Sequence, residues 1–139
     1  MIYGYIDGSW DLLHAGHVTI LQRAAALCDK LIVGVATNEL HAQKKGKPPI
    51  VSYGDRLEVV KALRCVACAV PHTHLDETNY SKLGISVRFV GTDHGGFGQE
   101  QTNGLQWCKD HGVQVVYLPY TEWISTTRIK EKVVASTVS

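Results

Sequence analysis

Charge is scarce and nearly balanced in this chain. Only 19% of its 139 residues are Asp, Glu, Lys or Arg, below the usual quarter, and the formal net charge at pH 7 is +1. A chain with so little net charge has no global field that would draw it to DNA or to an anionic membrane. Its hydrophobic content of 45% is enough for a real core, which argues against disorder as the main state.

Long apolar runs and targeting signals are also lacking. No apolar stretch approaches the roughly 20 residues that span a bilayer. The N-terminus reads as a strand and has no basic segment followed by an apolar one, so we expect no signal peptide. No repeat, linker or low-complexity segment divides the 139 residues, which is the ordinary size of one domain. We therefore expect a single domain over residues 1–139.

Cysteine is sparse and shows no repeated metal-binding spacing. The four cysteines are Cys28, Cys65, Cys68 and Cys108. Cys65 and Cys68 have a C-x-x-C spacing, which raises zinc or redox chemistry, but no second such pair follows. His72 and His74 lie close together, yet no carboxylate or cysteine completes a convincing metal set around them. We predict reduced thiols that pack as small apolar residues, no dedicated metal ligands, and a cytoplasmic protein.

Strand and helix patterns alternate along the chain. Leu31–Ala36 is a continuous apolar run, typical of a strand covered on both faces, and Val18–Leu27 has apolar residues at helical spacing. The other expected strands are Ile2–Ile6, Ala67–Val70 (stopped by Pro71), Val87–Val90 and Val113–Leu118. The other expected helices begin after Ser52 as N-cap, span Thr102–His111 before Gly112, and begin near Arg128. This alternation predicts an α/β fold with a parallel sheet and helices on both of its faces.

Four loops follow strands and should open at one edge of that sheet. They are Gly8–His17, Asn38–Lys47, Gly91–Gly96 and Pro119–Thr127. Right-handed crossovers place the ligands of such folds at the carboxyl ends of the strands. The topology therefore predicts that segments far apart in sequence converge on one site.

Two of these loops carry groups that suit a polyphosphate. His14 and His17 lie at the first strand-to-helix junction, and the hydroxyl-rich run Ser125–Thr127 opens the last helix. A helix N-terminus offers free N–H donors and the positive end of a dipole. Imidazolium would add positive charge where a leaving phosphate becomes more negative.

Two motifs resemble signatures of a known superfamily. Gly8–His17 reads G-S-W-D-L-L-H-A-G-H and is similar to the HxGH signature of nucleotidyltransferases. Tyr120–Thr127 reads Y-T-E-W-I-S-T-T and resembles the RTxGIST(T/S) signature of the cytidylyltransferase branch. The resemblance extends from Tyr3 to about Val134. It implies a Rossmann-like, doubly wound, parallel five-stranded sheet.

The resemblance also implies a reaction and its partners. CTP and an alcohol phosphate, with glycerol 3-phosphate as the leading acceptor, would give a CDP-alcohol and pyrophosphate without a covalent enzyme intermediate. Mg²⁺ is expected, bound mainly through the triphosphate. A homodimer is expected, with no nucleic-acid or membrane partner. Two alternatives remain: an adenylyltransferase of the same superfamily acting on another phosphate monoester, and a nucleotide-binding module without turnover.

The resemblance assigns roles to individual residues. The expected catalytic residues are His14, His17 and Lys44. The expected nucleotide- and phosphate-binding residues are Gly8, Ser9, Trp10, Gly16, Asp93, Thr121, Ile124, Ser125, Thr126 and Thr127. The expected substrate-binding residues are Asp11, Lys44, Lys47 and Arg64. Asp93 would accept a hydrogen bond from the exocyclic amine of cytosine, although adenine has such an amine too.

Several of these residues have a second interpretation. Asp11 orients either its own loop or the substrate, and the lysines after the second strand also fit a solvated basic loop. Arg56 and Arg64 both fall in the expected helix that follows Ser52, where a surface ion pair is the competing interpretation for Arg56. Two departures from the branch signature, Tyr120 in place of Arg and Trp123 in place of Gly, bear on the acceptor more than on nucleotidyl transfer.

Overall fold

A five-stranded parallel sheet forms the centre of the protein. The computed structural model describes residues 1–73, 82–92, 102–119 and 126–138. The strands are β1 (Tyr3–Gly8), β2 (Lys30–Ala36), β3 (Cys68–His72), β4 (Val87–Thr92) and β5 (Gln114–Pro119), in the order β3-β2-β1-β4-β5. Every pairing between neighbouring strands is parallel. The expected Rossmann-like α/β fold is confirmed.

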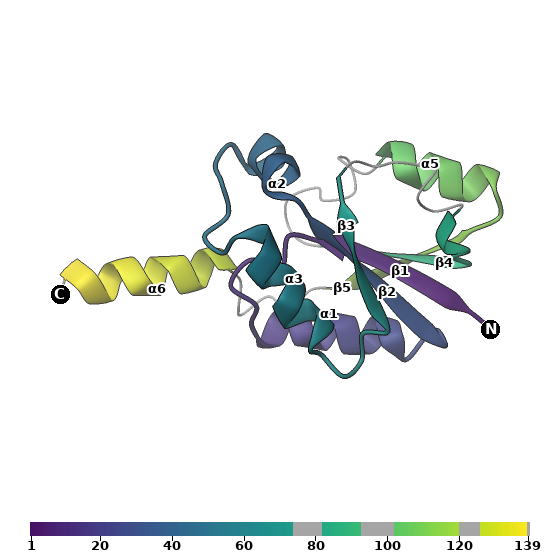
Figure 1. Ribbon diagram of the computed structural model, residues 1–139, viewed down its shortest axis with the longest axis horizontal. Coiled ribbons are helices and arrows are strands. Elements are labelled where there is room, and N and C mark those ends of the chain that lie inside the picture. The colour runs from purple at the N-terminus through teal and green to yellow at the C-terminus, as the bar shows by residue number, and fades with distance from the viewer. Residues whose placement is uncertain (74–81, 93–101, 120–125, 139) are drawn as a thin grey trace.

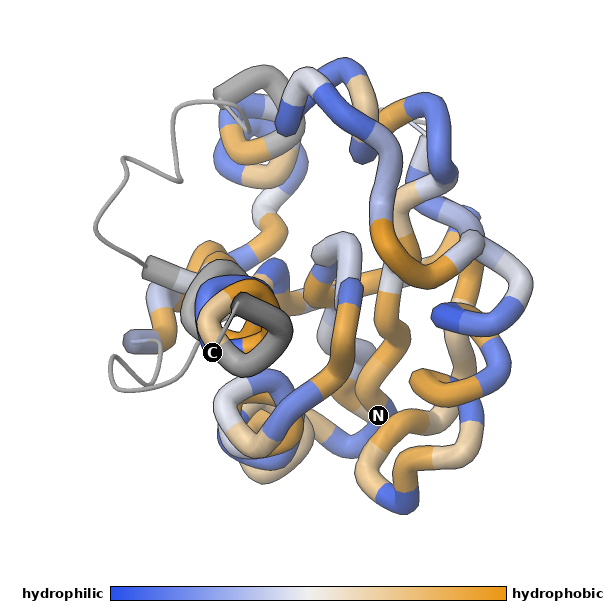
Figure 2. Tube along the Cα trace, turned by 90° about the vertical axis from the view of Figure 1, so that its left-hand side faces the viewer, coloured by the Kyte–Doolittle hydropathy of each residue, from blue (hydrophilic) through white to orange (hydrophobic). Residues whose placement is uncertain are grey.

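Helices lie on both faces of this sheet (Figure 1). The helices are α1 (Ala15–Ala25), α2 (Asn38–Lys45), α3 (Tyr53–Lys61), α5 (Thr102–Asp110) and α6 (Thr126–Val138). One core cluster joins the sheet to α1 and α3 and includes Ile6, Leu21 and Val60. A second cluster on the opposite face joins the sheet to α5 through Tyr5 and Cys108. Apolar residues gather along the strands between these layers (Figure 2).

The strand order places a topological switch point beside β1. The chain passes from β1 through β2 to β3 on one side, whereas β4 and β5 lie on the other side. Ligands of open α/β sheets bind at the carboxyl ends of the strands where this reversal occurs. Helix α1 begins there, directly after β1, and α6 also starts at this edge and extends away from the body of the protein (Figure 1).

Two local expectations from the sequence are wrong. Asn38–Lys45 forms the helix α2, where a loop was expected. Its ends carry ordinary signals, because the Thr37 side chain accepts from the Leu40 N–H at 3.2 Å and Gly46 closes the helix at a φ of 77°. The sequence pattern missed this helix because most of its residues are polar, and only Leu40 and His41 are buried.

Pro71 does not end the third strand either. β3 continues to His72, and Pro71 is aligned with Val35 of β2. β3 lies at the edge of the sheet, where the missing N–H of proline can be tolerated because one side of the strand has no partner strand. By contrast, the expected helix end at Gly112 is confirmed, with a φ of 75°. Among the described residues, no helix has the length and apolarity needed to cross a membrane.

Candidate active site

Two stacked imidazoles occupy the start of α1. His14 is the N-cap residue, and its Nδ1 accepts from the Gly16 N–H at 3.0 Å. The Nδ1 of His17 accepts from the His14 N–H at 3.1 Å, so the two side chains close a reciprocal capping arrangement. The ring centroids are 3.8 Å apart with an interplanar angle of 21°. The backbone of the helix start therefore fixes both rings side by side.

These contacts determine where the protons of the rings lie. Because each Nδ1 accepts a backbone hydrogen bond, the neutral form of each ring carries its proton on Nε2. Burial, with the nearby His14 ring adding to it and the Asp11 carboxylate opposing it, lowers the pKa of His17 to about 3. Burial also lowers the pKa of His14. Both rings are therefore neutral Nε2–H donors at pH 7 in the free protein, and the imidazolium expected from the sequence is not the resting form.

Trp10 supports this pair from the core. Its side chain is 3% exposed, its Nε1–H donates to the Gly34 carbonyl at 3.0 Å, and its ring meets the His17 ring edge-on at 5.5 Å. Gly8 gives the indole room, since a Cβ there would lie 2.9 Å from the Trp10 Cε2. Gly8 and Trp10 thus act on the shape of the loop that presents the histidines.

Asp11 takes the loop-orienting role. Its carboxylate is buried and accepts the N–H groups of Ile50 at 2.9 Å and Val51 at 2.8 Å. Lys130 of α6 lies 3.6 Å from the same carboxylate. Burial raises the pKa of Asp11, but the two backbone N–H groups and the charge of Lys130 outweigh it and leave the pKa lowered. Asp11 therefore ties the loop after β1 to the chain before α3 and to α6.

Arg56 is a buried connector, so the surface ion pair considered for it is wrong. Its side chain is 1% exposed. Its guanidinium donates to the carbonyls of Val51 at 2.8 Å, Ser9 at 2.7 Å and Ala36 at 2.7 Å, and to the Asn38 Oδ1 at 2.9 Å. One cation thereby satisfies carbonyls from three separate segments at the carboxyl edge of the sheet.

The lysines after β2 fall in two different places. Lys44 lies in the last turn of α2, and its charge helps to lower the pKa of Asp7 on β1. Lys47 follows Gly46 and lines a cavity of about 500 Å³ between α2 and α6. The other polar residues that line this cavity are His41, Lys45, Lys130 and Glu131. Both expected lysines are thus near the carboxyl edge, but only Lys47 opens into the cavity.

Arg64 is not brought to this edge. Helix α3 ends at Lys61, and Arg64 is exposed in the turn that precedes β3. Ala67, three residues further, donates to the carbonyl of Leu31 near the start of β2. This turn therefore belongs to the amino-terminal edge of the parallel sheet, opposite α1's first turn. The substrate contact that the resemblance implies for Arg64 is not formed at this edge within the chain and stays a prediction.

Some expected site residues lie outside the described residues. These are Asp93, Thr121, Ile124 and Ser125, together with the two departures Tyr120 and Trp123. Thr126 and Thr127 form the first turn of α6. The start of that helix agrees with the expected position of the phosphate-binding hydroxyls, whose phosphate contacts stay a prediction.

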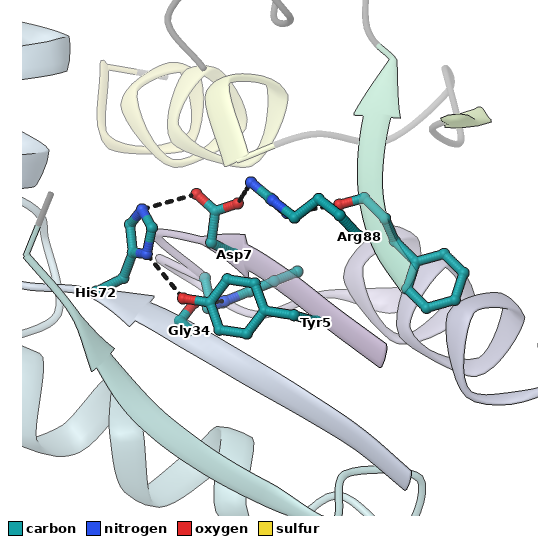
Figure 3. A network of polar contacts seen from close by, with 7 residues as sticks. Tyr5, Asp7, Gly34, His72 and Arg88 are labelled. Carbon is teal, nitrogen blue, oxygen red and sulfur yellow. Dashed lines mark hydrogen bonds and ion pairs between the residues drawn. The ribbon is translucent and has the colours of Figure 1, made fainter. Parts of the chain in front are cut away.

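A buried polar network, which the sequence analysis missed, lies beside the site (Figure 3). Asp7 of β1 forms an ion pair with Arg88 of β4 and lies 3.2 Å from the Nε2 of His72. The Nδ1 of His72 lies 2.7 Å from the Tyr5 hydroxyl, and the Arg88 guanidinium lies 5.3 Å from the centre of the Tyr5 ring. Gly34 leaves room for this hydroxyl, because a Cβ at that position would collide with it. The sequence offered one signal for this network, which is the presence of the charged residues Asp7 and Arg88 inside apolar strands.

The charges of this network hold Asp7 in its ionised form. Burial raises the pKa of Asp7, but the charges of Arg88, His72 and Lys44 and the hydrogen bond from Arg88 outweigh burial, and the pKa is lowered. The side chains of Asp7, His72 and Arg88 are each at most 3% exposed. A buried carboxylate that is paired in this way joins β1 to its neighbour β4 and, across β2, to His72 of β3 near the switch point.

The described residues do not form a metal cage. Among them, no group of three or more His, Cys, Asp or Glu side chains could hold a metal ion. Asp7 and Asp11 are engaged by Arg88 and by backbone N–H groups. Cys65 and Cys68 are free thiols, partly buried and exposed, respectively. The part of the chain that the structure describes thus offers magnesium no dedicated set of ligands.

The chain belongs to the cytidylyltransferase-like family. The family model of that description matches residues 5–132. The expectation of a CTP-dependent transferase is confirmed at the level of the family.

Individual relatives agree with this assignment. Glycerol-3-phosphate cytidylyltransferase of Bacillus subtilis (strain 168) is 36% identical over 128 residues, which are 91% of this chain and 92% of that protein. The bifunctional protein HldE of Hydrogenovibrio crunogenus is 36% identical over 131 residues, 93% of this chain but 27% of that protein. A lipopolysaccharide core biosynthesis protein from Thermoplasma volcanium GSS1 has the same fold, with a TM-score of 0.71 and 24% identity over 87% of this chain and 97% of that one.

Proposed function

We propose that this protein transfers CMP from CTP to the phosphate of a small alcohol phosphate and releases pyrophosphate. The observation that carries the proposal is the pair of imidazoles at the N-terminus of α1, stacked at 3.8 Å with both Nδ1 atoms occupied by backbone N–H groups. This arrangement leaves two Nε2–H donors at the positive end of a helix dipole, which suits a bound triphosphate.

The chain's own residues would act by positioning and by charge stabilisation. An oxygen of the acceptor phosphate attacks the α-phosphorus of CTP in line, and the bond from the α-phosphorus to the bridging oxygen of pyrophosphate breaks. The Nε2–H groups of His14 and His17 donate to phosphate oxygens as negative charge grows during that step. Lys44 adds a positive charge close to the same edge, and Ser125, Thr126 and Thr127 bind the outer phosphates. Gly16 allows close approach of the backbone to the triphosphate.

Glycerol 3-phosphate is the leading acceptor. Support comes from the similarity to glycerol-3-phosphate cytidylyltransferases of Bacillus subtilis and Staphylococcus aureus, which this chain matches over about nine tenths of their length. A second candidate, transfer from ATP to another phosphate monoester, is kept because the HxGH motif within Gly8–His17 also resembles that of adenylyltransferases. The match to the two cytidylyltransferases over about nine tenths of their length favours the first candidate.

A pyrophosphate-release screen tests the proposal. The purified protein is assayed with CTP or ATP, each with magnesium, against a panel of alcohol and sugar phosphates. We expect turnover with CTP and glycerol 3-phosphate and little with ATP. Turnover with ATP alone would replace the first candidate by the second, and no release with any pair would leave a nucleotide-binding module.

Three further expectations belong to this proposal. Magnesium would arrive with the triphosphate and neutralise its charge. The chain would act as a single domain in a homodimer, which light scattering after gel filtration measures directly. A cytoplasmic location fits the free thiols of the described residues.

A further inference from the structure

The cavity between α2 and α6 has an unusual lining. It holds about 500 Å³, in the range of sites for small molecules. Three ammonium groups line it, those of Lys45, Lys47 and Lys130, against one carboxylate, that of Glu131. They come from α2, from the chain after it and from α6, so folding brings like charges together around one space.

A buried donor adds to these charges. His41 lines the same cavity and is 4% exposed. Its Nδ1 lies 2.7 Å from the Ser9 Oγ, whereas its buried Nε2 has no hydrogen-bond partner among the described residues. Leaving a buried polar atom unpaired is costly, so an unpaired ring nitrogen on a residue that lines the cavity points to a missing partner. When the Ser9 hydroxyl donates to Nδ1, the Nε2–H is a donor for that ligand.

The cavity shares a wall with the candidate active site. Lys130 contacts the Asp11 carboxylate at 3.6 Å, and His41 contacts Ser9. Ser9 and Asp11 belong to the loop that carries His14. A ligand bound among these lysines would therefore lie beside the loop that carries the stacked imidazoles.

We propose that this cavity binds the phosphate of the acceptor, a phosphate monoester dianion, through Lys45, Lys47, Lys130 and the Nε2–H of His41. This inference rests on the proposed nucleotidyl transfer and assigns the second substrate its site. A dianion with three terminal oxygens matches three ammonium groups and one neutral donor. His41 is a specificity-determining contact in this arrangement, because it is the neutral and fixed member of the set.

Steady-state kinetics of variants test the site. Lys130→Met and Lys45→Met should each raise the KM for the acceptor by about tenfold or more, as expected for a lost hydrogen bond to a charged group, and leave the KM for CTP within about twofold. Lys132→Met is the matched control on α6, since Lys132 does not line the cavity. An unchanged acceptor KM in both cavity variants, or a rise in the CTP KM alone, would overturn the assignment.

Two substitutions separate the ring nitrogens of His41. His41→Asn keeps a group near the Nδ1 position, which bonds Ser9, and removes the Nε2 donor. His41→Gln keeps a donor near the Nε2 position. We expect His41→Asn to raise the acceptor KM about tenfold and His41→Gln to recover much of that loss. Equal acceptor KM values in wild type and His41→Asn would remove His41 from the site.

Direct binding distinguishes failure of the site from failure of the proposed function. Inorganic phosphate and glycerol 3-phosphate are titrated calorimetrically into the protein without nucleotide, in wild type and in the Lys45→Met/Lys130→Met double variant. Binding that the double variant loses supports the site even if no nucleotide pair turns over, which would reject the transfer reaction alone. Turnover with binding unaffected by the double variant would reject the site alone.

Discussion

Asp7→Asn should destabilise the protein strongly because it removes one charge from a buried pair. Asp7 and Arg88 form an ion pair in which both side chains are at most 3% exposed. Asparagine fits the same space but leaves the guanidinium without its counter-charge. Breaking a buried pair in this way costs about 3–5 kcal/mol. A domain of this size has a free energy of unfolding of about 5–15 kcal/mol, so the loss is a large fraction of it.

A double-mutant cycle isolates the pair from the rest of the network. Arg88→Met leaves Asp7 buried without the guanidinium that pairs with it, and it should cost a similar amount. The double variant Asp7→Asn/Arg88→Met should be more stable than the sum of the two single losses implies, by about 1–3 kcal/mol. Urea unfolding followed by circular dichroism measures all four proteins. Additive losses, or a cost of Asp7→Asn below about 1 kcal/mol, would refute the reasoning.

The same pair predicts a pH dependence with a definite sign. Asp7 has a lowered pKa in the folded protein, below its usual value of 3.8. Its contribution to stability is therefore complete above that usual value and is lost as the pH falls below it through the folded pKa. Between pH 5 and pH 2, the free energy of unfolding should fall less steeply in Asp7→Asn than in wild type. Parallel curves would contradict the assignment of the charged form to Asp7.

Three further outcomes are expected. His14→Ala should lower turnover about 10²- to 10³-fold because a transition-state donor is lost, and it should lower the free energy of unfolding by about 1 kcal/mol because the N-cap is lost. His14→Asn should restore the stability but not the turnover. Pyrophosphate release measures the turnover, and thermal unfolding measures the stability. Because the pKa of His17 is about 3, protonation of His17 should cause no fall in kcat/KM between pH 8 and pH 6. A fall in kcat/KM near pH 6.5 that is present in wild type and absent in His17→Asn would contradict this. Arg56→Met should cost about 3 kcal/mol or more, because three carbonyls and the Asn38 amide lose their donor, whereas Lys61→Met on the same helix should cost less than about 0.5 kcal/mol in urea unfolding.

Local patterns in the sequence were enough to predict the architecture and the place of the site. Continuous apolar runs such as Leu31–Ala36 indicate strands covered on both faces, and their alternation with helices admits few topologies. Because parallel strands end at one edge, the loop with His14 and His17 could be assigned to that edge from its position after the first strand. The helix start near Thr126 could be assigned from local residue types. These features depend on neighbours within a few residues, so a linear pattern contains them.

The contacts between distant segments could be identified only in the folded structure. Asp7 pairs with Arg88 across 81 positions, and Arg56 reaches Ser9 across 47, separations that no local pattern encodes. The proton positions of His14 and His17 likewise depended on which backbone N–H groups point at each ring. Arg64 was assigned to the substrate by resemblance alone, and its place beyond the far end of α3 became visible only in the folded chain. The burial of a side chain and the direction in which it points are properties of the folded chain. The charges that surround the site could therefore be identified only from the structure.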